Sequence, residues 1–486
     1  MPSLGNSLTV IIDQCTVCLC EQDDANKTNI KIIVGKFMAN KRGEFSSRFG
    51  FIMAAAGSAV GLGNIWGFPT QAASNGGGAF LLVYLILAFC LAYPALMAEL
   101  IIGRHAHGNA VQALRLISRG PISRFIGGTT GIVGLVVASF ILSFYAIVSG
   151  WMMAFCLNAV LTFAGMEDAA EWLVSFGMTR NILFMMLFML LTIGIISRGV
   201  QGGIERWSSR LMPIMIVTLL LLVFYVLTLE GAMEGLKVYL VPDFNRVMSP
   251  SLIIAALGSA FFSLSLGVGT MLIYGSYIRD DENLPLVGGY VTLVDIGIAV
   301  LAGFLIIPAM YVAQYNGVEI FDAAGVLISE DTLIFTVLPA LFKTMGAIGL
   351  VVSFIFFFLM SIAALTSSIS MLEVPVAYAI ENHGAKRSKA VWIIGLLISG
   401  ISTIVLINFS WLFGLVVEAT TRYSQPLLAL MLCIFAGWVW NRADLLKELR
   451  KGNAAVESSL FWKIWPWYVR IVCPLIIGVI FVNSVL

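Results

Sequence analysis

Two short polar stretches interrupt long apolar runs, and their residue types could bind a cation together with a carboxylate. The first, "VGLGNIWGFP" at residues 60–69, places Asn64 among glycines and a proline. The second, "FFSLSLGVG" at residues 261–269, places Ser263 and Ser265 beside two glycines. A helix that unwinds inside a bilayer frees backbone carbonyls, which coordinate cations, and half-helix amino ends, which attract carboxylates. These residue types therefore predict a binding site between two interrupted helices.

A third polar island, formed by Thr366, Ser367 and Ser368, lies in the apolar run "AALTSSISM" at residues 363–371. Taken alone, such hydroxyls bond to carbonyls one turn back in the same helix. Beside two interrupted helices, the same hydroxyls offer hard oxygen ligands for a small cation. Glycines in membrane helices also permit close packing, but packing alone does not require Asn64 or Gly/Ser runs in both halves of the chain.

The composition is typical of a helical protein with many membrane spans. Of the 486 residues, 59% are hydrophobic and 11% are charged, and the mean hydropathy is +0.96; soluble domains do not have such values. The formal net charge of +1 gives no case for nucleic-acid binding. The sequence has no HExxH or GxSxG motif and no paired intramembrane carboxylates, so we do not expect an enzyme.

The sequence contains eleven apolar runs of about 20 residues, the length that spans the hydrocarbon core. We predict that each forms a transmembrane helix. They lie at 48–70, 77–102, 125–160, 181–197, 207–229, 250–278, 286–315, 348–380, 390–408, 411–440 and 467–485. The run "LIFTVLPALFKTMGA" at 333–347 is shorter and amphipathic, so we expect it to form a helix in an external loop.

The loops between these spans carry most of their Lys and Arg residues on one side of an odd–even alternation. The residues on this side are Lys41, Arg42, Arg104, Arg115, Arg119, Arg124, Arg198, Arg206, Arg210, Arg279, Lys386, Arg387, Lys389, Lys447, Arg450 and Lys451. The other side carries Arg180, Lys237, Arg246 and Lys343. Because basic loops stay in the cytoplasm, the sequence predicts a multi-pass protein of the inner (plasma) membrane. Its N-terminus is expected in the cytoplasm and its C-terminus outside.

The two interrupted segments are the first and the sixth predicted spans. An offset of five spans reverses the direction in which the second half enters the membrane. Interrupted helices at matching places of inverted halves are typical of transporters. The expected fold class is therefore all-α polytopic membrane protein, with an inverted five-plus-five repeat, broken helices 1 and 6, and eleven transmembrane helices.

Four parts of the chain are expected from this pattern. They are a cytoplasmic N-terminal segment 1–47, a first repeat 48–230, a second repeat 250–440, and a cytoplasmic loop with the eleventh helix at 441–486. For residues 1–37 two interpretations stay open. They are a cytoplasmic tail, or they come from an upstream start, with Met38 as the natural first residue.

Several stretches of the chain resemble the neurotransmitter:sodium symporter family, in particular its bacterial amino-acid transporters. These stretches are "SSRFGFIMAAAGSAVGLGNIWGFP", "NGGGAF", "FFSLSLGVG", "ALTSS" and "GWVW", and the resemblance extends from Lys41 to the end. It implies sodium-driven import of an amino acid by alternating access, with the amino acid and the lipid bilayer as partners. It leaves the oligomeric state open.

The resemblance implies two bound Na⁺ ions. One site would use carbonyls and hydroxyls of Gly57, Val60, Ala363, Thr366 and Ser367. The other would use the Ala59 carbonyl, the side chains of Asn64 and Ser263, and the carboxylate of the substrate. Because the substrate would complete the shell of this second ion, each would bind more tightly when the other is present.

The resemblance also implies a substrate site. Its backbone and side chains would come from Ala59, Gly61, Leu62, Gly63, Ile141, Tyr145, Phe262, Ser263, Ser265, Val268 and Met371. Monoamine carriers of the family have an aspartate at the position of Gly61, whereas glycine leaves room for a substrate with its own carboxylate. The side-chain lining is largely apolar, so we expect a hydrophobic or aromatic amino acid first and a small neutral one second.

The seventh predicted span departs from the family pattern. In our alignment Val294 stands where leucine-transporting relatives have an asparagine of a sodium site, and Asp295 follows it. An acid inside a membrane span is a functional candidate. Asp295 either ligates sodium directly or supplies the fixed negative charge that chloride supplies in animal relatives, and in both cases we expect no chloride requirement. A third interpretation is a protonated structural aspartate.

The outer gate of the family is missing in this chain. The two positions of its usual ion pair hold Gly67 and Val417. We therefore expect closure on the outside by an aromatic lid of Tyr145 and Phe262. Glu418 and Arg422, one turn apart, either take over part of this role or form a helix-surface pair.

Arg42, Tyr277 and Glu381 match the cytoplasmic latch of the family, which favours a protein that cycles between conformations. Two other functions on the same fold stay open: a non-transporting amino-acid sensor and a sodium-independent facilitator. An ion channel is disfavoured, since a pore needs rings of charge or repeated filter carbonyls and the sequence shows neither.

Overall fold

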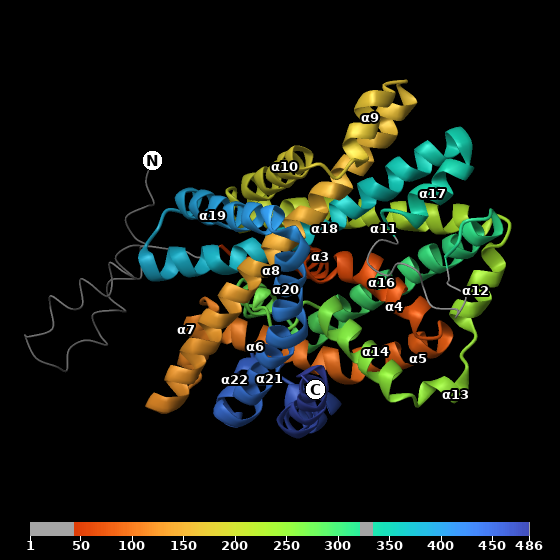
Figure 1. Cartoon of the computed structure of the whole chain (residues 1–486). Coiled ribbons are helices and arrows are strands. Elements are labelled where there is room, and N and C mark those ends of the chain that lie inside the picture. The colour runs from red at the N-terminus through yellow and green to blue at the C-terminus, as the bar shows by residue number, and fades with distance from the viewer. Residues whose placement is uncertain (1–42, 321–333, 486) are drawn as a thin grey trace, which may run out of the picture. The chain divides into compact units, whose positions relative to one another are not determined.

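The computed structural model describes residues 43–320 and 334–485, which form helices joined by turns and loops (Figure 1). Within these ranges the one strand-like pairing outside the helices is a bridge between Gly77 and Pro242. The α-helices of the first half are α3 (Arg48–Ala59), α4 (Phe68–Ser74), α5 (Gly78–Leu87), α6 (Tyr93–Ala106), α7 (Ala110–Leu116), α8 (Pro121–Phe163), α9 (Glu167–Val174), α10 (Met178–Ile196), α11 (Arg206–Leu227), α12 (Ala232–Leu240) and α13 (Phe244–Val247).

The second half is also helical. Its α-helices are α14 (Pro250–Ser263), α15 (Thr270–Gly275), α16 (Leu284–Tyr315), α17 (Val337–Thr344), α18 (Gly346–His383), α19 (Arg387–Ile407), α20 (Phe409–Val417), α21 (Gln425–Ile434), α22 (Arg442–Arg450), α23 (Leu460–Trp467) and α24 (Cys473–Val485). Short π-helical segments join several helices: η2 (Gly63–Gly67), η3 (Ala88–Ala92), η4 (Val200–Glu205), η5 (Glu418–Ser424), η6 (Phe435–Val439) and η8 (Tyr468–Val472), and η7 (Val456–Ser458) is a 3-10 turn.

Nine of the described helices are long and apolar enough to cross a membrane, and ten segments qualify when α3 and η2–α4 count as one span bent by 57°. Eleven were predicted, and the difference lies in the sixth predicted span. There α14 has 14 residues and α15 only six, because the chain leaves the helix at 264–269. Neither piece alone reaches the ~20 residues that a span needs. The predicted loop helix within 333–347 is present as α17.

A distant carboxylate binds the two residues that precede helix α3. The Ser47 side chain accepts a hydrogen bond from the Gly50 N–H at 2.9 Å, as an N-cap does. The carboxylate of Glu205 in η4 accepts bonds from the N–H and hydroxyl groups of both Ser46 and Ser47, at 2.7 to 3.2 Å. The end of η4 therefore holds the start of α3.

The first interruption follows Ala59. Val60 is extended, with φ −70° and ψ 115°, and the helix resumes as η2 and α4. The side-chain oxygen of Asn64 accepts a bond from the Gly61 N–H at 3.1 Å. The same residue that was predicted as a ligand therefore also binds an amide that the break leaves without a helical partner.

The second interruption, 264–269, is held from outside by two other helices. Ser265, Gly267 and Gly269 have φ values of 51°, 84° and 84°, in the left-handed region that favours glycine. The Gly267 N–H donates to Glu99 Oε1 of α6 at 2.6 Å. A Cβ on Gly267 would lie 2.4 Å from the Gln425 carbonyl oxygen at the start of α21, so glycine also permits this close approach.

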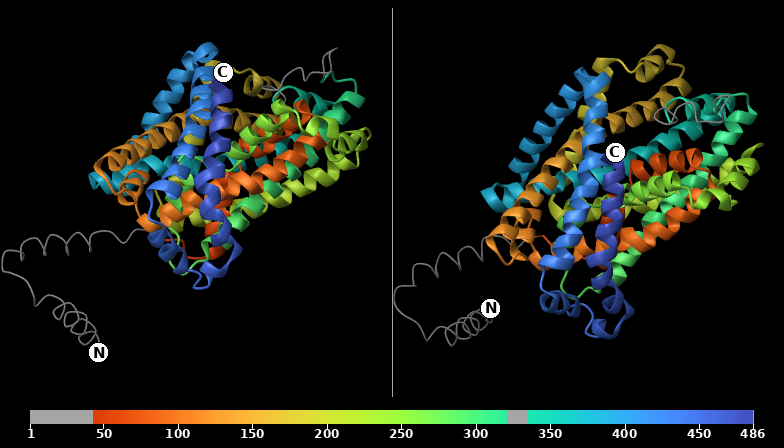
Figure 2. Two further views of the ribbon diagram at one scale, coloured as in Figure 1. Left: turned by 90° about the horizontal axis from the view of Figure 1, so that it is seen from below. Right: turned by 60° about the horizontal axis from the view of Figure 1, so that its bottom comes forward.

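The long helices α8 and α18 pack along each other, and α10 and α19 pack against α8. Helix α16 packs against α3, η2 and α4, and α18 packs against α3. Figure 2 shows α24 beside α21, in agreement with their contacts. Both interruptions therefore lie next to long helices that stay continuous there.

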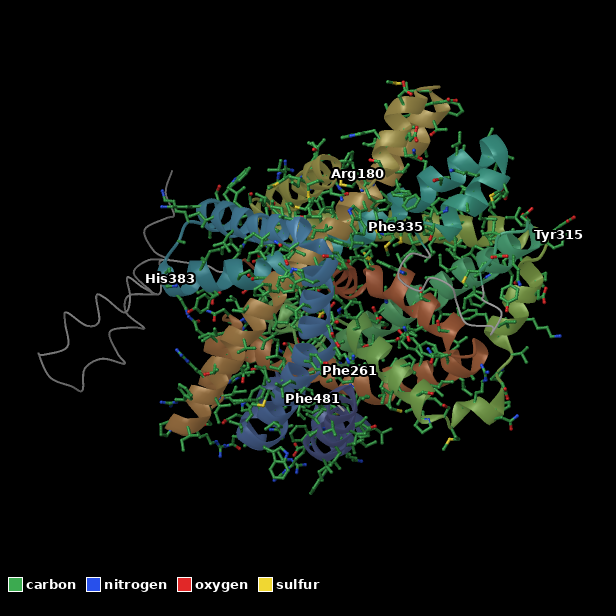
Figure 3. The ribbon with its side chains drawn as sticks, in the orientation of Figure 1. Arg180, Phe261, Tyr315, Phe335, His383 and Phe481 are labelled. Atoms are coloured by element: carbon green, nitrogen blue, oxygen red, sulfur yellow. The ribbon has the colours of Figure 1, made fainter. Side chains whose placement is uncertain are left out.

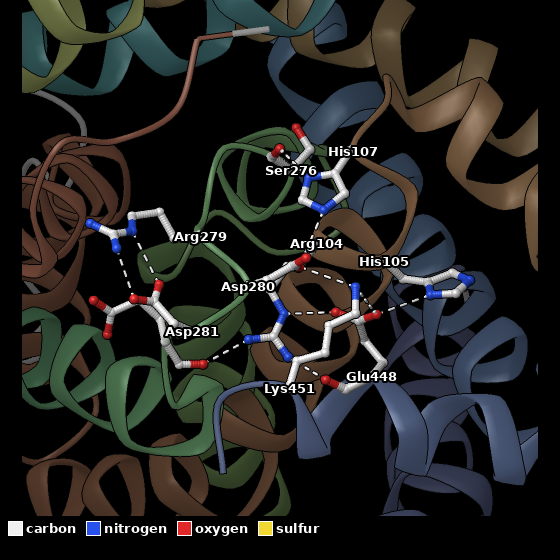
Figure 4. Close-up of polar contacts among 10 residues, drawn as sticks. Arg104, His105, His107, Ser276, Arg279, Asp280, Asp281, Glu448 and Lys451 are labelled. Atoms are coloured by element: carbon white, nitrogen blue, oxygen red, sulfur yellow. Dashed lines mark hydrogen bonds and ion pairs between the residues drawn. The ribbon is translucent and has the colours of Figure 1, made fainter. Parts of the chain in front are cut away.

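Three connections meet at one end of the helices in a buried ion cluster (Figure 4). Arg104 at the end of α6 donates to a Glu448 carboxylate oxygen at 2.8 Å and to the Glu448 carbonyl at 2.6 Å. Lys451 pairs with Glu448 at 3.0 Å and with Asp280, after α15, at 3.1 Å. The connections after α6, α15 and η6 therefore share one end, as their predicted sidedness requires.

This cluster predicts an acid sensitivity of the fold. Burial raises the pKa of Glu448, but the hydrogen bond from His105, the charge of Arg104 and the hydrogen bond from Lys451 outweigh it and hold the pKa at about 2, below the ordinary 4.5. A depressed pKa contributes stability above pH 4.5, and this contribution is lost as the pH falls toward about 2. Glu448→Gln should lower the free energy of unfolding at neutral pH by about 3–5 kcal/mol. It should also weaken the dependence of stability on pH in this acid range.

The measurement is thermal unfolding of the purified protein in detergent across the acid range. Glu457→Gln is the matched control, because Glu457 pairs with Arg450 but more than half of its side chain is exposed. A Glu448→Gln variant as stable as this control would contradict the prediction.

Candidate functional site

Three polar side chains from different helices meet at the two interruptions. Asn64 Nδ2 donates to Ser263 Oγ at 2.7 Å and to Asp295 Oδ1 at 2.8 Å. The Ser263 hydroxyl donates to Asp295 Oδ2 at 2.7 Å. Asn64 and Asp295 are 0% exposed and Ser263 is 1% exposed. η2, α14 and α16 thus bring an amide, a hydroxyl and a carboxylate into one buried cluster.

At the seventh predicted span the structure places Asp295, and not Val294, in this cluster. Val294 was aligned with the ligand position, but it is Asp295 that contacts Asn64, through its carboxylate and, at 3.3 Å, through its carbonyl oxygen. Val294 is half-buried and packs against the apolar core. Successive residues of an α-helix point about 100° apart, so only one of the two can face the site.

The cluster is suited to a small hard cation. The Asp295 carboxylate contacts neutral donors, and among the described residues no Lys, Arg or His compensates its charge. An isolated carboxylate inside a membrane protein is costly, and a cation held by the surrounding oxygens would supply the missing charge. Among the described residues, no group of three or more His, Cys, Asp or Glu side chains is placed to hold a metal ion.

A second group of oxygens lies between α3 and α18. The Ser367 hydroxyl donates across the helix gap to the carbonyls of Val60 at 2.9 Å and Gly57 at 3.3 Å. The Thr366 hydroxyl bonds back within its own helix, to Ile362 O at 3.2 Å and Ala363 O at 3.0 Å. The five residues predicted for this sodium site therefore lie together, and the alternative of bonding one turn back applies to Thr366 but not to Ser367.

A cavity lies beside both groups of oxygens. Its lining residues are Ala59, Gly61, Leu62, Gly63, Ile141, Tyr145, Phe262, Ser265, Val268, Ser367, Met371 and Gln425. All predicted substrate residues except Ser263 are among them. Ser263 lies in the adjoining cluster with Asn64 and Asp295. Ser367 lines the cavity as well as the second group of oxygens.

Gly61 lies close to the side chains of Tyr145 and Ser367. A Cβ built on Gly61 would lie 2.5 Å from the Tyr145 hydroxyl and 2.7 Å from Ser367 Oγ. The Leu62 N–H donates to the Tyr145 hydroxyl at 3.2 Å. Backbone N–H groups and the Tyr145 hydroxyl thus lie where a substrate carboxylate could bind, and only glycine leaves the space.

Sequence reasoning missed Gln425. Its side chain is 3% exposed, lines the cavity, and its amide oxygen has no hydrogen-bond partner among the described residues. Buried polar atoms are rarely left unsatisfied in this way. A signal was present, because Gln425 is the only carboxamide in the predicted span 411–440, but nothing in the sequence showed which way it faces.

A cluster of aromatic rings surrounds Phe335. Phe335, just before α17, is 7% exposed and packs with ring centroids 5.3 to 6.3 Å from those of Trp66, Trp151, Phe155, Phe176 and Phe357. The Arg180 guanidinium lies over the Phe176 ring at 5.0 Å, and Figure 3 labels Arg180 and Phe335 in this region. Glu418 and Arg422 form an exposed pair at 2.8 Å, which favours the helix-surface interpretation.

Two residues of the predicted cytoplasmic latch, Tyr277 and Glu381, form hydrogen bonds with different partners. The Tyr277 hydroxyl donates to Glu373 Oε1 at 2.6 Å, and Arg387 donates to both oxygens of Glu373. Glu381 accepts bonds from the backbone and side-chain N–H groups of Asn109. Arg42 lies outside the described residues. Sequence reasoning did not find these contacts of Tyr277 and Arg387 with Glu373, which is 0% exposed.

The comparisons with known proteins agree on one family. The model of the sodium:neurotransmitter symporter family matches residues 42–174 and 164–486. A relative from Bacillus subtilis, named the uncharacterized sodium-dependent transporter YhdH, is 35% identical over 462 residues, which cover 91% of this chain and 97% of the relative. A canine sodium- and chloride-dependent taurine transporter is 28% identical, over 71% of this chain and 61% of its own length. The crystal structure of MhsT in complex with L-phenylalanine matches with a TM-score of 0.77 and 34% identity, over 91% of this chain and 100% of that one.

Proposed function

Because the chain belongs to the sodium:neurotransmitter symporter family, we propose that it imports a neutral, hydrophobic or aromatic amino acid together with sodium by alternating access. The cavity at the two interruptions carries this proposal. It combines backbone N–H groups and the Tyr145 hydroxyl for a carboxylate with an apolar lining for a side chain. The similarity to MhsT, whose structure contains L-phenylalanine, supports an aromatic substrate.

Two sodium ions would bind with the substrate. Gly57, Val60, Ala363, Thr366 and Ser367 would hold one. Asn64, Ser263, Asp295 and the Ala59 carbonyl would hold the other, with the substrate carboxylate as the last ligand. A shared ligand couples the two affinities reciprocally. Asp295 contacts both Asn64 and Ser263, and this fixed negative charge supports a cycle without a chloride requirement.

The proposed topology has eleven spans in an inverted five-plus-five arrangement, with repeats at 48–230 and 250–440 and a last helix within 441–486. α3 with η2–α4, and α14 with α15, would each form one broken span. The 57° bend of the first pair supports this. The basic loops that meet around Arg104 and Glu448 support a cytoplasmic location for that end, which places the N-terminus in the cytoplasm and the C-terminus outside.

Alternating access would open and close the two sides in turn. Toward the outside, the Tyr145 and Phe262 lid and the rings around Phe335 would separate. Toward the cytoplasm, the contacts of Glu373 with Tyr277 and Arg387 would break. When η4 moves, the hydrogen bonds from Ser46 and Ser47 to Glu205 would break, and the start of α3 would be free to move.

Equilibrium binding of labelled leucine, tryptophan, tyrosine and alanine to the purified protein tests this function, with sodium or choline as the cation. Saturable binding that disappears in choline is the expected result, and the strongest competitor names the substrate class. Sodium-independent binding would contradict the shared-ligand coupling.

Proteoliposomes distinguish the two alternative functions. A symporter accumulates labelled substrate when an inward sodium gradient is imposed. A sensor binds in sodium without accumulation, and a facilitator exchanges internal for external substrate without sodium.

Gln425 is expected to favour substrates whose side chain carries a hydrogen-bond donor, such as tyrosine or tryptophan. An unsatisfied buried acceptor costs about 1–3 kcal/mol, and a donor on the substrate would remove this cost. Gln425→Leu should therefore weaken tyrosine binding by about 5- to 100-fold and leave phenylalanine binding nearly unchanged. Competition of both amino acids for the same labelled ligand measures the ratio. An equal change for tyrosine and phenylalanine would argue against this role.

A further inference from the structure

A second cavity lies where η6 meets η8 and α22 begins. η6 and η8 pack against each other, and Gly437 permits this, since a Cβ there would lie 2.8 Å from the Arg470 Cα. The lining shares no residue with the substrate cavity. Its lining contains three arginines and four tryptophans: Arg119, Arg442, Arg470, Trp438, Trp440, Trp465 and Trp467.

The charge of this cavity is uncompensated. None of the described residues that line it is acidic, and among all described residues no carboxylate pairs with Arg119, Arg442 or Arg470. A guanidinium has five N–H donors and does not lose its proton in proteins. Three such groups at one cavity therefore offer N–H donors to an anion, since no carboxylate among the described residues occupies them.

Aromatic rings rather than acids hold two of these arginines in place. The Arg470 guanidinium lies over the Trp438 ring at 4.1 Å, and the indole N–H of Trp438 donates to the Arg470 carbonyl at 2.8 Å. The Arg442 guanidinium lies over the Trp462 ring at 5.3 Å. Stacking on a ring face fixes the plane of a guanidinium and leaves its edge donors available for a planar or tetrahedral oxyanion.

The position of Arg470 points to a ligand at the membrane surface. Arg470 lies inside the apolar segment Leu460–Val479, which is long enough to span a membrane, and an arginine there needs a partner. Trp438 and Trp467 are 58% and 55% exposed, as is typical of tryptophans at the membrane–water interface. Leu460, Ile464 and Ile471 are exposed on the same segment and would contact acyl chains.

We propose that this cavity binds the phosphate headgroup of an anionic phospholipid. The three arginines supply donors for the phosphate, and the exposed apolar residues of α23 and η8 supply a surface for the lipid tails. Basic cavities between membrane helices, near the interface, bind such headgroups. A zwitterionic lipid has the same phosphate but also an ammonium group, for which the lining offers no acid. The site therefore selects lipids by net negative charge.

Native mass spectrometry of the full chain, released from micelles with equal amounts of phosphatidylglycerol and phosphatidylcholine, tests the proposal. The wild-type protein should retain phosphatidylglycerol in preference. Arg470→Gln should reduce this preference about fivefold, and the triple variant with Arg119→Gln and Arg442→Gln by on the order of 100-fold. All three arginines are exposed. The double variant Arg119→Gln with Arg442→Gln leaves the contact of Arg470 with Trp438 intact, so it keeps the test valid if Arg470→Gln fails to fold.

The matched control is Arg210→Gln, which removes the same charge from an exposed position on α11 and should leave the preference unchanged. Equal retention of both lipids by the wild-type protein would overturn the proposal. An equal loss in the control would also overturn it, because the effect would then follow net charge. Displacement of phosphatidylglycerol by inorganic phosphate at matched concentration would identify a site for a soluble anion instead.

Discussion

Replacing Asp295 with asparagine is expected to weaken amino-acid binding about 100-fold in chloride-free medium and to make it depend on chloride. The carboxylate is fully buried and lies 2.8 Å from Asn64 and 2.7 Å from Ser263, so its charge acts on a cation there with little screening. Removing one partner of a buried charge pair costs about 3 kcal/mol or more, which corresponds to about 100-fold in affinity. Binding of a labelled amino acid at a series of sodium concentrations, with chloride or gluconate as the anion, measures both effects.

Thr292→Val is the matched control. Thr292 is buried on the same helix, and its hydroxyl donates to Gly288 O at 3.0 Å within that helix, so this variant perturbs α16 without touching the cluster of Asn64 and Ser263. Asparagine has nearly the same shape as aspartate. The melting temperature of the Asp295→Asn variant shows whether the protein is folded. Unchanged chloride-free binding would mean that the carboxylate carries no charge in the cycle, as the structural interpretation of a protonated aspartate requires.

Gly61→Ala is expected to weaken amino-acid binding by about 10- to 100-fold. The added methyl group would lie 2.5 Å from the Tyr145 hydroxyl and 2.7 Å from Ser367 Oγ, which is closer than nonbonded atoms can approach. Tyr145 would have to leave the Leu62 N–H, and Ser367 would have to leave the Val60 carbonyl. Overpacking of this kind costs about 1–3 kcal/mol, and both contacts belong to the proposed binding site. Saturation binding in sodium measures the loss.

Gly297→Ala separates this effect from the general cost of a methyl group in a membrane helix. A Cβ on Gly297 of α16 meets no atom within 4 Å, so this variant should bind with wild-type affinity. Wild-type affinity in Gly61→Ala would contradict the proposed position of the substrate carboxylate next to the first interruption.

Residue type alone could identify much of the candidate site. Asn64, Ser263 and Ser367 are polar residues in long apolar runs, where each polar group needs a partner. Their motifs also carried the family assignment, which the family model and the sequence relatives confirm. The resemblance also implied the lining of the cavity, and the structure brings all of these residues together there except Ser263.

Other residues could not be found in this way because their partners lie far along the chain. Ser46 contacts Glu205, 159 residues away, and nothing near either residue indicates the contact. Glu373 is recognisable as the partner of Tyr277 and Arg387 only once α15, α18 and α19 are packed. To predict which way the Asp295 side chain points, one must know how α16 is rotated about its axis, and an error of one residue would point it elsewhere.

The sequence by itself determined the class of the protein, the family, the approximate spans and the places where two helices break. These properties depend on local hydropathy and on a few consecutive residues, such as the glycines around Asn64. Only the tertiary structure decided that Asp295 rather than Val294 faces the site, that Gln425 lines the cavity, and that aromatic rings from several segments surround Phe335. The physical reason is that these contacts join segments hundreds of residues apart, as for Asn64 and Asp295 with a separation of 231, and depend on how helices rotate and pack against each other.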